Sequence, residues 1–209
     1  GTGDARWEGS EETGLGTAAL ISDVGSGVTF TLSGNISGEG NLLHSGEGTL
    51  VLSGDSSFTG GTHATRGVVE VQSATGLGAG VVNIESTADL HVTVEEGTTD
   101  ARVTTTLAAA DTTVQGDVVI SGTESTERIL NVATGGYDNS STTLHDNGTL
   151  LVNGKGVTAA TGTLSGSGTV AVSDATGSGA SATVGQMTAY TGDFVVEGNK
   201  ASITVENGS

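Results

Sequence analysis

The sequence predicts an all-β protein, built as a parallel β-helix (β-solenoid) of roughly ten short turns. Three observations predict this fold. Apolar and polar residues alternate along many short segments, which is the period-two pattern of strands. The 209 residues include 36 Gly and no Pro, which indicates frequent tight turns between uninterrupted backbone ladders. A short motif also recurs along the chain, as expected when similar coils stack on one another.

The expected strands are short and are spread along the whole chain. No helix is expected, and the best helical candidate, the Thr-rich segment 104–114, is interpreted as a turn between strands because its ends are β-branched. The predicted strands are 28–32, 49–52, 68–71, 81–84, 89–94, 117–120, 128–132, 149–152, 169–172, 193–196 and 202–205.

The recurring motif is a Gly followed by apolar residues two and four positions later. Its intervals of 19, 13, 36, 32 and 20 residues are irregular, but several lie near 20 or a multiple of 20. A single coil cannot bury its own apolar face, whereas a stack of coils can. Region 98–145 is the least regular and is expected to carry a loop that leaves the rod. The motif begins at Gly48, Gly67, Gly80, Gly116, Gly148 and Gly168.

No break in composition divides the chain, so residues 1–209 are predicted to form a single β-helical segment of a larger protein. The structural alternative is an antiparallel sandwich, which would need two-residue hairpin turns between strands of matched length.

The charge excludes some classes of partner. The formal net charge is −18 and there are only six Lys and Arg residues, so binding to a nucleic acid backbone is not expected. Direct contact of this segment with an anionic membrane is disfavoured for the same reason. The chain has no Cys, which excludes a disulfide framework and thiolate chemistry.

One segment carries a family resemblance. Residues 46–84, GEGTLVLSGDSSFTGGTHATRGVVEVQSATGLGAGVVNI, resemble the autotransporter-associated β-strand repeat (passenger-associated transport repeat) of bacterial passenger domains. The clearest copy spans 32–84, and a weaker copy spans 164–208, where Asp193 replaces the second Gly of a turn. The matching elements are Gly46–Gly54, Phe58–Thr62, Gly67–Val71, Leu77–Gly80 and Val81–Ile84.

The resemblance implies a right-handed β-helical rod on the surface of a Gram-negative bacterium, anchored at the outer membrane or secreted. It also implies a C-terminal β-barrel translocator in the full-length protein. We expect a structural and adhesive role that supports export. The expected partners are host glycans, a host surface or matrix protein, or like rods.

The candidate reactive residues lie in and around the same repeat. Gly54-Asp55-Ser56 is similar to the surroundings of a nucleophilic serine, and His44 or His63 would have to act as its base. The same residues are explained by a turn, in which Asp and Ser bind nearby backbone groups. We therefore predict no catalytic residue. Phe58 is expected to fill a corner of the coil, and Gly60, Gly61 and Gly67 to be required by the backbone.

No metal or cofactor is predicted, because the four His residues are isolated from one another; the presence of a structural calcium ion stays open. The alternative function is a β-helical polysaccharide-active enzyme, a lyase or hydrolase. A lyase needs acidic residues that hold a cation and a basic residue that removes a proton. The available cations, none of them in an Asp-rich cluster, are Arg66, Arg102, Arg128, Lys155 and Lys200.

Overall fold

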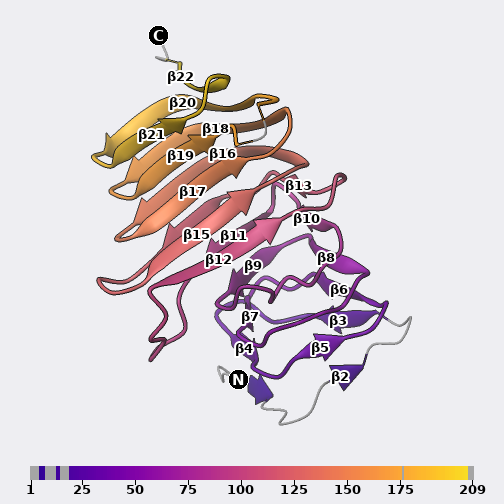
Figure 1. The fold of residues 1–209 in the computed structure, drawn as a ribbon. Helices are drawn as coiled ribbons and strands as arrows, with labels where there is room; N and C mark the ends of the chain where they lie inside the picture. Colours follow the sequence, from indigo (N-terminus) through magenta and orange to yellow (C-terminus); the bar gives the residue numbers. More distant parts are fainter. Residues whose placement is uncertain (1–4, 8–12, 15–18, 176, 207–209) are drawn as a thin grey trace.

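In a computed structural model, the protein folds as a parallel β-solenoid. The structure describes residues 5–7, 13–14, 19–175 and 177–206. Within these ranges every regular element is a strand, and every pair of strands is parallel, as the stacked arrows of Figure 1 show. No helix long and apolar enough to cross a membrane occurs in the described part of the chain. The parallel pairing confirms the solenoid and excludes the antiparallel sandwich.

Each coil contributes strands to up to three faces. Face one is formed by β1 (Ala5–Trp7), β4 (Thr29–Leu32), β7 (Thr49–Leu52), β9 (Gly67–Val71), β11 (Ala88–Val92) and β14 (Val118–Ser121). Face three is formed by β3 (Leu20–Ser22), β6 (Asn41–His44), β8 (Gly61–Ala64), β10 (Val82–Ile84), β13 (Thr113–Val114) and β22 (Ala201–Val205).

Three long strands join faces one and three. They are β16 (Gly136–His145), β18 (Val157–Gly166) and β20 (Ala180–Tyr190). The first residues of β16 pair with β13, and its last residues pair with β14, so the strand turns a corner. At this corner Asn139 donates its side-chain N–H to the Ser141 carbonyl at 2.6 Å. Thr161 makes the equivalent bond to the Thr163 carbonyl at 3.1 Å in β18.

Face two becomes a regular sheet only in the later coils. Its strands are β12 (Arg102–Leu107), β15 (Glu127–Val132), β17 (Gly148–Asn153), β19 (Thr169–Ser173) and β21 (Asp193–Glu197). In the first coils, the strands described on this face are the short pair β2 (Thr13–Gly14) and β5 (Ile36–Ser37). Face two is therefore a continuous parallel sheet only from β12 onward.

The register fixes the coil length. Thr29 pairs with Thr49 and Thr49 with Val68, intervals of 20 and 19 residues, as the recurring Gly motif predicts. The intervals grow to 28 residues between Leu90 and Val118. The solenoid has about eight turns, close to the predicted ten.

The interpretation of residues 104–114 as a turn was wrong. This segment contains most of β12 and all of β13. The alternation within β12 is that of a strand, because Thr105 and Leu107 are buried whereas Arg102 and Thr106 are exposed. Thr favours strands, and burial of every second residue outweighs the helix-like Ala content.

The irregular region does carry a loop that projects from the rod between β11 and β12, and it begins at Thr93 rather than at residue 98 (Figure 1).

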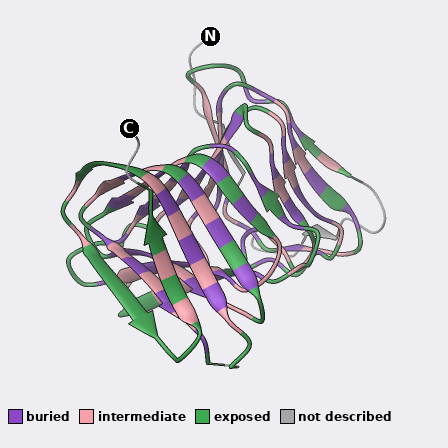
Figure 2. Cartoon of the chain, turned by 90° about the horizontal axis from the view of Figure 1, so that it is seen from above, coloured by how far each residue is buried: buried purple, intermediate pink, exposed green. Residues whose placement is uncertain are grey.

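The core consists of apolar rows that run along the solenoid. Leu50, Val69, Leu90 and Val118 are neighbours in successive coils, and each side chain is 0% exposed. Figure 2 shows the resulting alternation of buried and less buried residues along the strands. Phe58 is also 0% exposed, which confirms that it fills the interior.

Candidate functional site

The surface beside the loop 93–101 is hollowed. Two adjoining hollows of about 370 and 280 Å³ share Ser53, Gln72 and Glu95 in their walls. The first is completed by Thr31, Val51 and Glu96, and the second by Asp55, Ser73, Ala74, Thr98, Asp100, Arg102, Val103 and Thr104. We call the two together the acidic groove, after Asp55, Glu95, Glu96 and Asp100.

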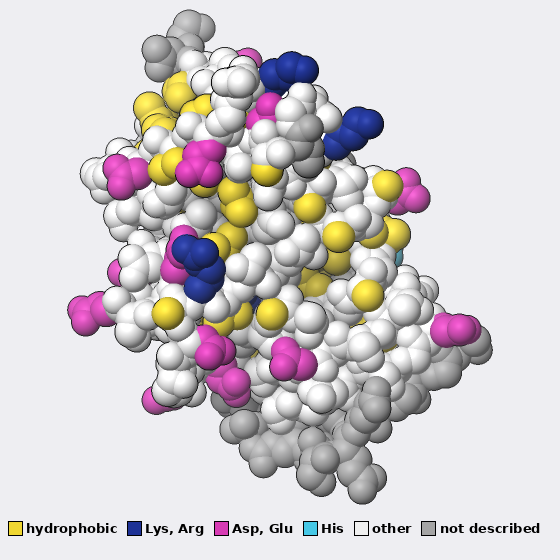
Figure 3. Space-filling view, viewed as in Figure 1, with side chains coloured by type: hydrophobic (Ala, Val, Ile, Leu, Met, Phe, Trp, Pro, Cys, Tyr) yellow, Lys and Arg dark blue, Asp and Glu magenta, His cyan; other side chains and the backbone are white. Residues whose placement is uncertain are grey.

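The carboxylates of the acidic groove are exposed. The cation that lines it is Arg102, whose Nε donates to Glu127 Oε2 at 2.7 Å and is thereby already paired. On the face drawn in Figure 3, Asp and Glu side chains likewise outnumber Lys and Arg. The groove therefore presents an excess of negative charge.

Arg128 fixes the wall of the groove from inside. Its side chain projects from β15 and is 0% exposed. The Nε atom donates to the Thr93 carbonyl at 2.6 Å, and Nη2 donates to the carbonyls of Val71 (3.2 Å) and Ser73 (3.0 Å). Nη2 also donates to Thr105 Oγ1 at 2.9 Å. One guanidinium thus joins three successive coils at the point where the loop departs.

The environment of Arg128 is unusual for a charged group. Its contacts are with carbonyl and hydroxyl oxygens, and Nη1 has no hydrogen-bond partner among the described residues. Burial lowers the pKa of Arg128 to about 10, because desolvation disfavours the charged form. The guanidinium still carries its charge at neutral pH.

The structure separates the residues that resemble a serine nucleophile site. Ser56 is buried, where its Oγ accepts from the Ile36 amide at 3.2 Å. Asp55 Oδ1 accepts from Thr75 Oγ1 at 3.3 Å. His44 and His63 lie on face three, in β6 and β8, whereas Ser56 belongs to the part of its coil that follows β7 on the way to face three. Within the described residues, the Ser56 hydroxyl bonds to backbone groups of Ile36 and Gly54 and to no histidine, as a turn residue would.

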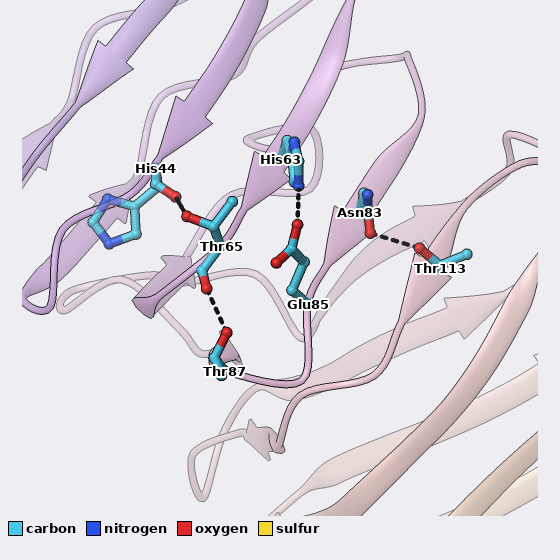
Figure 4. A network of polar contacts seen from close by, with 7 residues as sticks. All are labelled: His44, His63, Thr65, Asn83, Glu85, Thr87 and Thr113. Atoms are coloured by element: carbon cyan, nitrogen blue, oxygen red, sulfur yellow. Dashed lines mark hydrogen bonds and ion pairs between the residues drawn. The ribbon is translucent and has the colours of Figure 1, made fainter.

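The two histidines take part in polar contacts along face three (Figure 4). His63 Nε2 lies 2.9 Å from Glu85 Oε1, and both side chains are partly exposed. Buried His44 contacts Ser22 Oγ and the Gly48 carbonyl through its ring nitrogens, at 3.3 Å each. Burial lowers its pKa, because desolvation disfavours the imidazolium. Neighbouring coils are also joined by Thr113 Oγ1, which donates to Asn83 Oδ1 at 2.6 Å.

The cations considered for a lyase are dispersed. Arg66 pairs with Glu47 at 3.6 Å, and Lys200 Nζ donates to the Gly177 carbonyl at 2.9 Å. Arg128 is buried, and Arg102 is the one of these cations that borders the acidic groove. Lys155 lies in the exposed turn between β17 and β18. In the described part of the chain, no three His, Asp or Glu side chains are grouped so as to hold a metal ion.

The backbone explains the glycines that the sequence marks as required. Gly61 and Gly67 have φ values of 102° and 65°, the left-handed region that side chains rarely adopt. At Gly60 the constraint is space instead, because a Cβ there would collide with Asn41 and with the Gly40 carbonyl of the neighbouring coil.

Comparison with known proteins finds a family match around the strands β7, β8 and β9. The family described as Passenger-associated-transport-repeat matches residues 44–71, which run from the end of β6 through β7 and β8 to the end of β9. Residues 44–71 are an autotransporter passenger repeat. This passenger repeat spans more than one turn of the solenoid, because its Leu52 pairs with its Val71 in the next coil. It ends at Val71, whose carbonyl accepts a hydrogen bond from Arg128.

A curated protein is similar over a longer stretch. The adhesin BmaC autotransporter of Brucella suis biovar 1 (strain 1330) is 36% identical over 107 residues. The match covers 44% of this chain but 3% of that adhesin, so the chain corresponds to a small part of the relative's length. No solved structure gives a significant match.

Sequence reasoning missed the acidic groove and the role of Arg128. The sequence offers Arg128 only as one of the cations available to a lyase. The partners that reveal its role are distant in sequence, because Thr105 and Val71 are 23 and 57 residues away. The only local signal is the position of Arg128 within the apolar strand ERILNV.

Proposed function

We propose that this chain is a single rod segment, residues 1–209, of an autotransporter passenger that is displayed by or secreted from a Gram-negative bacterium. Its role is structural and adhesive, and it is not enzymatic. The observation that carries the proposal is the passenger repeat at 44–71, which spans rather more than one coil of a continuous parallel solenoid. The similarity to an autotransporter adhesin supports the same role.

The proposed mechanism depends on shape and surface. Stacked coils with a continuous apolar interior make a stiff support, in which each coil is stabilised by its neighbours. Outward Ser, Thr, Asn, Asp and Glu side chains offer polar contacts to glycans, to matrix or surface proteins, or to like rods. The full-length protein is expected to carry a C-terminal translocator that exports the rod.

The location is tested by labelling intact bacteria with antibodies against this chain. We expect labelling before the cells are permeabilised, and loss of the epitope when a protease is added outside. Labelling only after permeabilisation would contradict the proposed location.

Adhesion and catalysis are separated by two assays on the purified chain. Saturable binding to immobilised glycans or matrix proteins, without release of reducing ends from acidic or mucin-type polysaccharides, is the expected result. Turnover that is lost in Asp100→Asn or Arg102→Gln would establish the alternative, a β-helical polysaccharide-active enzyme whose active site lies in the acidic groove.

A further inference from the structure

The strand β12 has one free edge. Face two has the strand order β12-β15-β17-β19-β21, so β12 lies at its border, and its strand partner among the described residues is β15. The preceding coil approaches β12 through a side chain, where Thr105 Oγ1 donates to the Ser73 carbonyl at 3.0 Å, and not through a backbone ladder. An unpaired strand edge is a template for another strand.

The backbone hydrogen bonds between β12 and β15 identify which N–H and C=O groups of β12 are free. The Ala101 carbonyl accepts from the Glu127 amide, and the Leu107 carbonyl accepts from the Ala133 amide. Residues of a parallel strand direct their backbone groups alternately to the two sides, so the N–H and C=O groups of Arg102 and Thr104 face away from β15. On that side, neither residue has a backbone partner among the described residues. Both border the acidic groove.

The charge around this edge selects the kind of partner. Asp55, Glu95 and Asp100 border the hollow that contains the edge, and Glu96 borders the adjoining hollow. Arg102 is bound to Glu127 and does not neutralise them. A second copy of this chain carries a net charge of −18 and would bring carboxylates against carboxylates.

We propose that the acidic groove binds an extended, cationic polypeptide segment, which adds to the free edge of β12 as a further strand. Backbone bonds to Arg102 and Thr104 supply affinity, and Lys or Arg side chains of the segment pair with Glu95, Glu96 and Asp100. The inference deepens the adhesive part of the proposed function and rests on it. It assigns the partner's chemistry and the site of contact.

The test measures binding of a labelled peptide of four Lys-Thr repeats to the purified chain by fluorescence anisotropy. A matching Glu-Thr peptide and a Lys-Thr peptide with N-methyl groups on alternate residues are the comparison probes. We expect saturable binding of the Lys-Thr peptide, weaker binding at higher salt, and at least about five-fold loss on N-methylation, the equivalent of one hydrogen bond.

Two test variants address separately the free backbone edge and the negative charge of the groove. Thr104→Pro removes a free N–H without removing a ladder bond, and Thr106→Pro is its matched control on the same side of β12, beyond the groove lining. Glu95→Gln with Glu96→Gln removes groove charge, and Glu124→Gln with Asp146→Asn is the control pair of exposed residues elsewhere. We expect about five-fold weaker binding from each test variant and little change from each control.

Three results would overturn the inference: no binding of the Lys-Thr peptide, equal binding of the Glu-Thr peptide, or binding unaffected by both Thr104→Pro and N-methylation. The last would mean that cationic peptides adsorb without adding a strand. If Thr104→Pro does not fold, the N-methylated peptide still tests the edge. Surface labelling and glycan binding that persist while the peptide fails would refute this inference alone, because they test the proposed function independently.

Discussion

Val196 lies directly beside Val172 in the parallel ladder of face two, yet Val172 is 1% exposed and Val196 is 49% exposed. The two side chains occupy the same interior row in successive coils. The difference arises because Val172 is covered on both sides, whereas in the described residues no coil covers β21, which is exposed along its length (Figure 2).

This pair gives a matched test of the interior row. Val172→Ala is expected to lower the free energy of unfolding by about 2 kcal/mol, since it removes buried methyl groups and leaves a cavity. Val196→Ala should cost less than about half of that, because its site is open to water. Urea unfolding of the two variants checks this expectation. Equal losses would show that the end of the solenoid is covered in solution.

Arg128→Met should destabilise the protein by about 3 kcal/mol, because the carbonyls of Val71, Ser73 and Thr93 lose a buried donor. The matched control is Arg102→Met, which breaks an exposed ion pair and should cost less than about 1 kcal/mol. Hydrogen exchange should increase in the loop 93–101 and in β12 of the Arg128 variant only. Equal stability of the two variants would contradict a role for Arg128 in joining the coils.

The glycines offer a graded series of Ala substitutions. Gly25 has ordinary φ and open space, and Gly27 has open space but a φ of 73°. Gly61 combines a φ of 102° with a collision against the Val81 carbonyl. We expect little change at Gly25, a loss of about 1 kcal/mol at Gly27, and a larger loss at Gly61. Thermal and urea unfolding give the order, and a Gly61 variant as stable as the Gly25 variant would refute it.

The lowered pKa of His44 predicts a loss of stability in acid. Above its ordinary pKa of 6.5 the imidazole is neutral in both states, and as the pH falls below 6.5 the unfolded chain binds the proton first. The free energy of unfolding should therefore fall more steeply between pH 7 and 5 in the wild type than in His44→Gln. Ser22→Ala keeps the histidine and should keep the steeper slope. Parallel stability curves for the wild type and His44→Gln would rule out this contribution.

The raised pKa of Asp89 predicts a gain of stability in acid, the opposite of the effect of His44. Its pKa is raised above the ordinary 3.8, first by burial and then by the nearby Asp117, so its ionised form opposes folding at neutral pH. This penalty disappears as the pH falls through the raised folded pKa and below 3.8. Asp89→Asn should thus stabilise the protein at pH 7 and have no such effect near pH 3. Asp117→Asn should give a smaller gain, and a loss of stability in Asp89→Asn at pH 7 would contradict the assigned direction.

The sequence predicts the repetitive part of this fold well. Alternation places 11 of the 22 described strands but misses the long strands β16, β18 and β20. The spacing of the Gly motif gives the 19- and 20-residue coils between Thr29 and Val68. These signals work because the same local rule, one apolar face per short strand, applies in every coil. They fail at β12, where Thr and Ala leave the local preference ambiguous and the position against β15 decides.

The candidate site could not be predicted in the same way. Asp55 and Asp100 line one hollow, although 45 residues separate them along the chain. Their proximity depends on the number of residues in each intervening coil, and that number changes at the loop 93–101. No local pattern encodes such a sum, and the polar residues around Asp55 also suit an ordinary turn.

The long strands have a mechanical consequence. The hydrogen bonds between coils lie along the rod, so tension applied to its ends would open them one coil at a time. Strands β4, β6, β7 and β8 contain four residues each, whereas β16 and β18 contain ten and β20 contains eleven. We therefore expect the passenger repeat and its neighbours to unravel at lower force, while the half beyond β15 stays intact and keeps carrying the load.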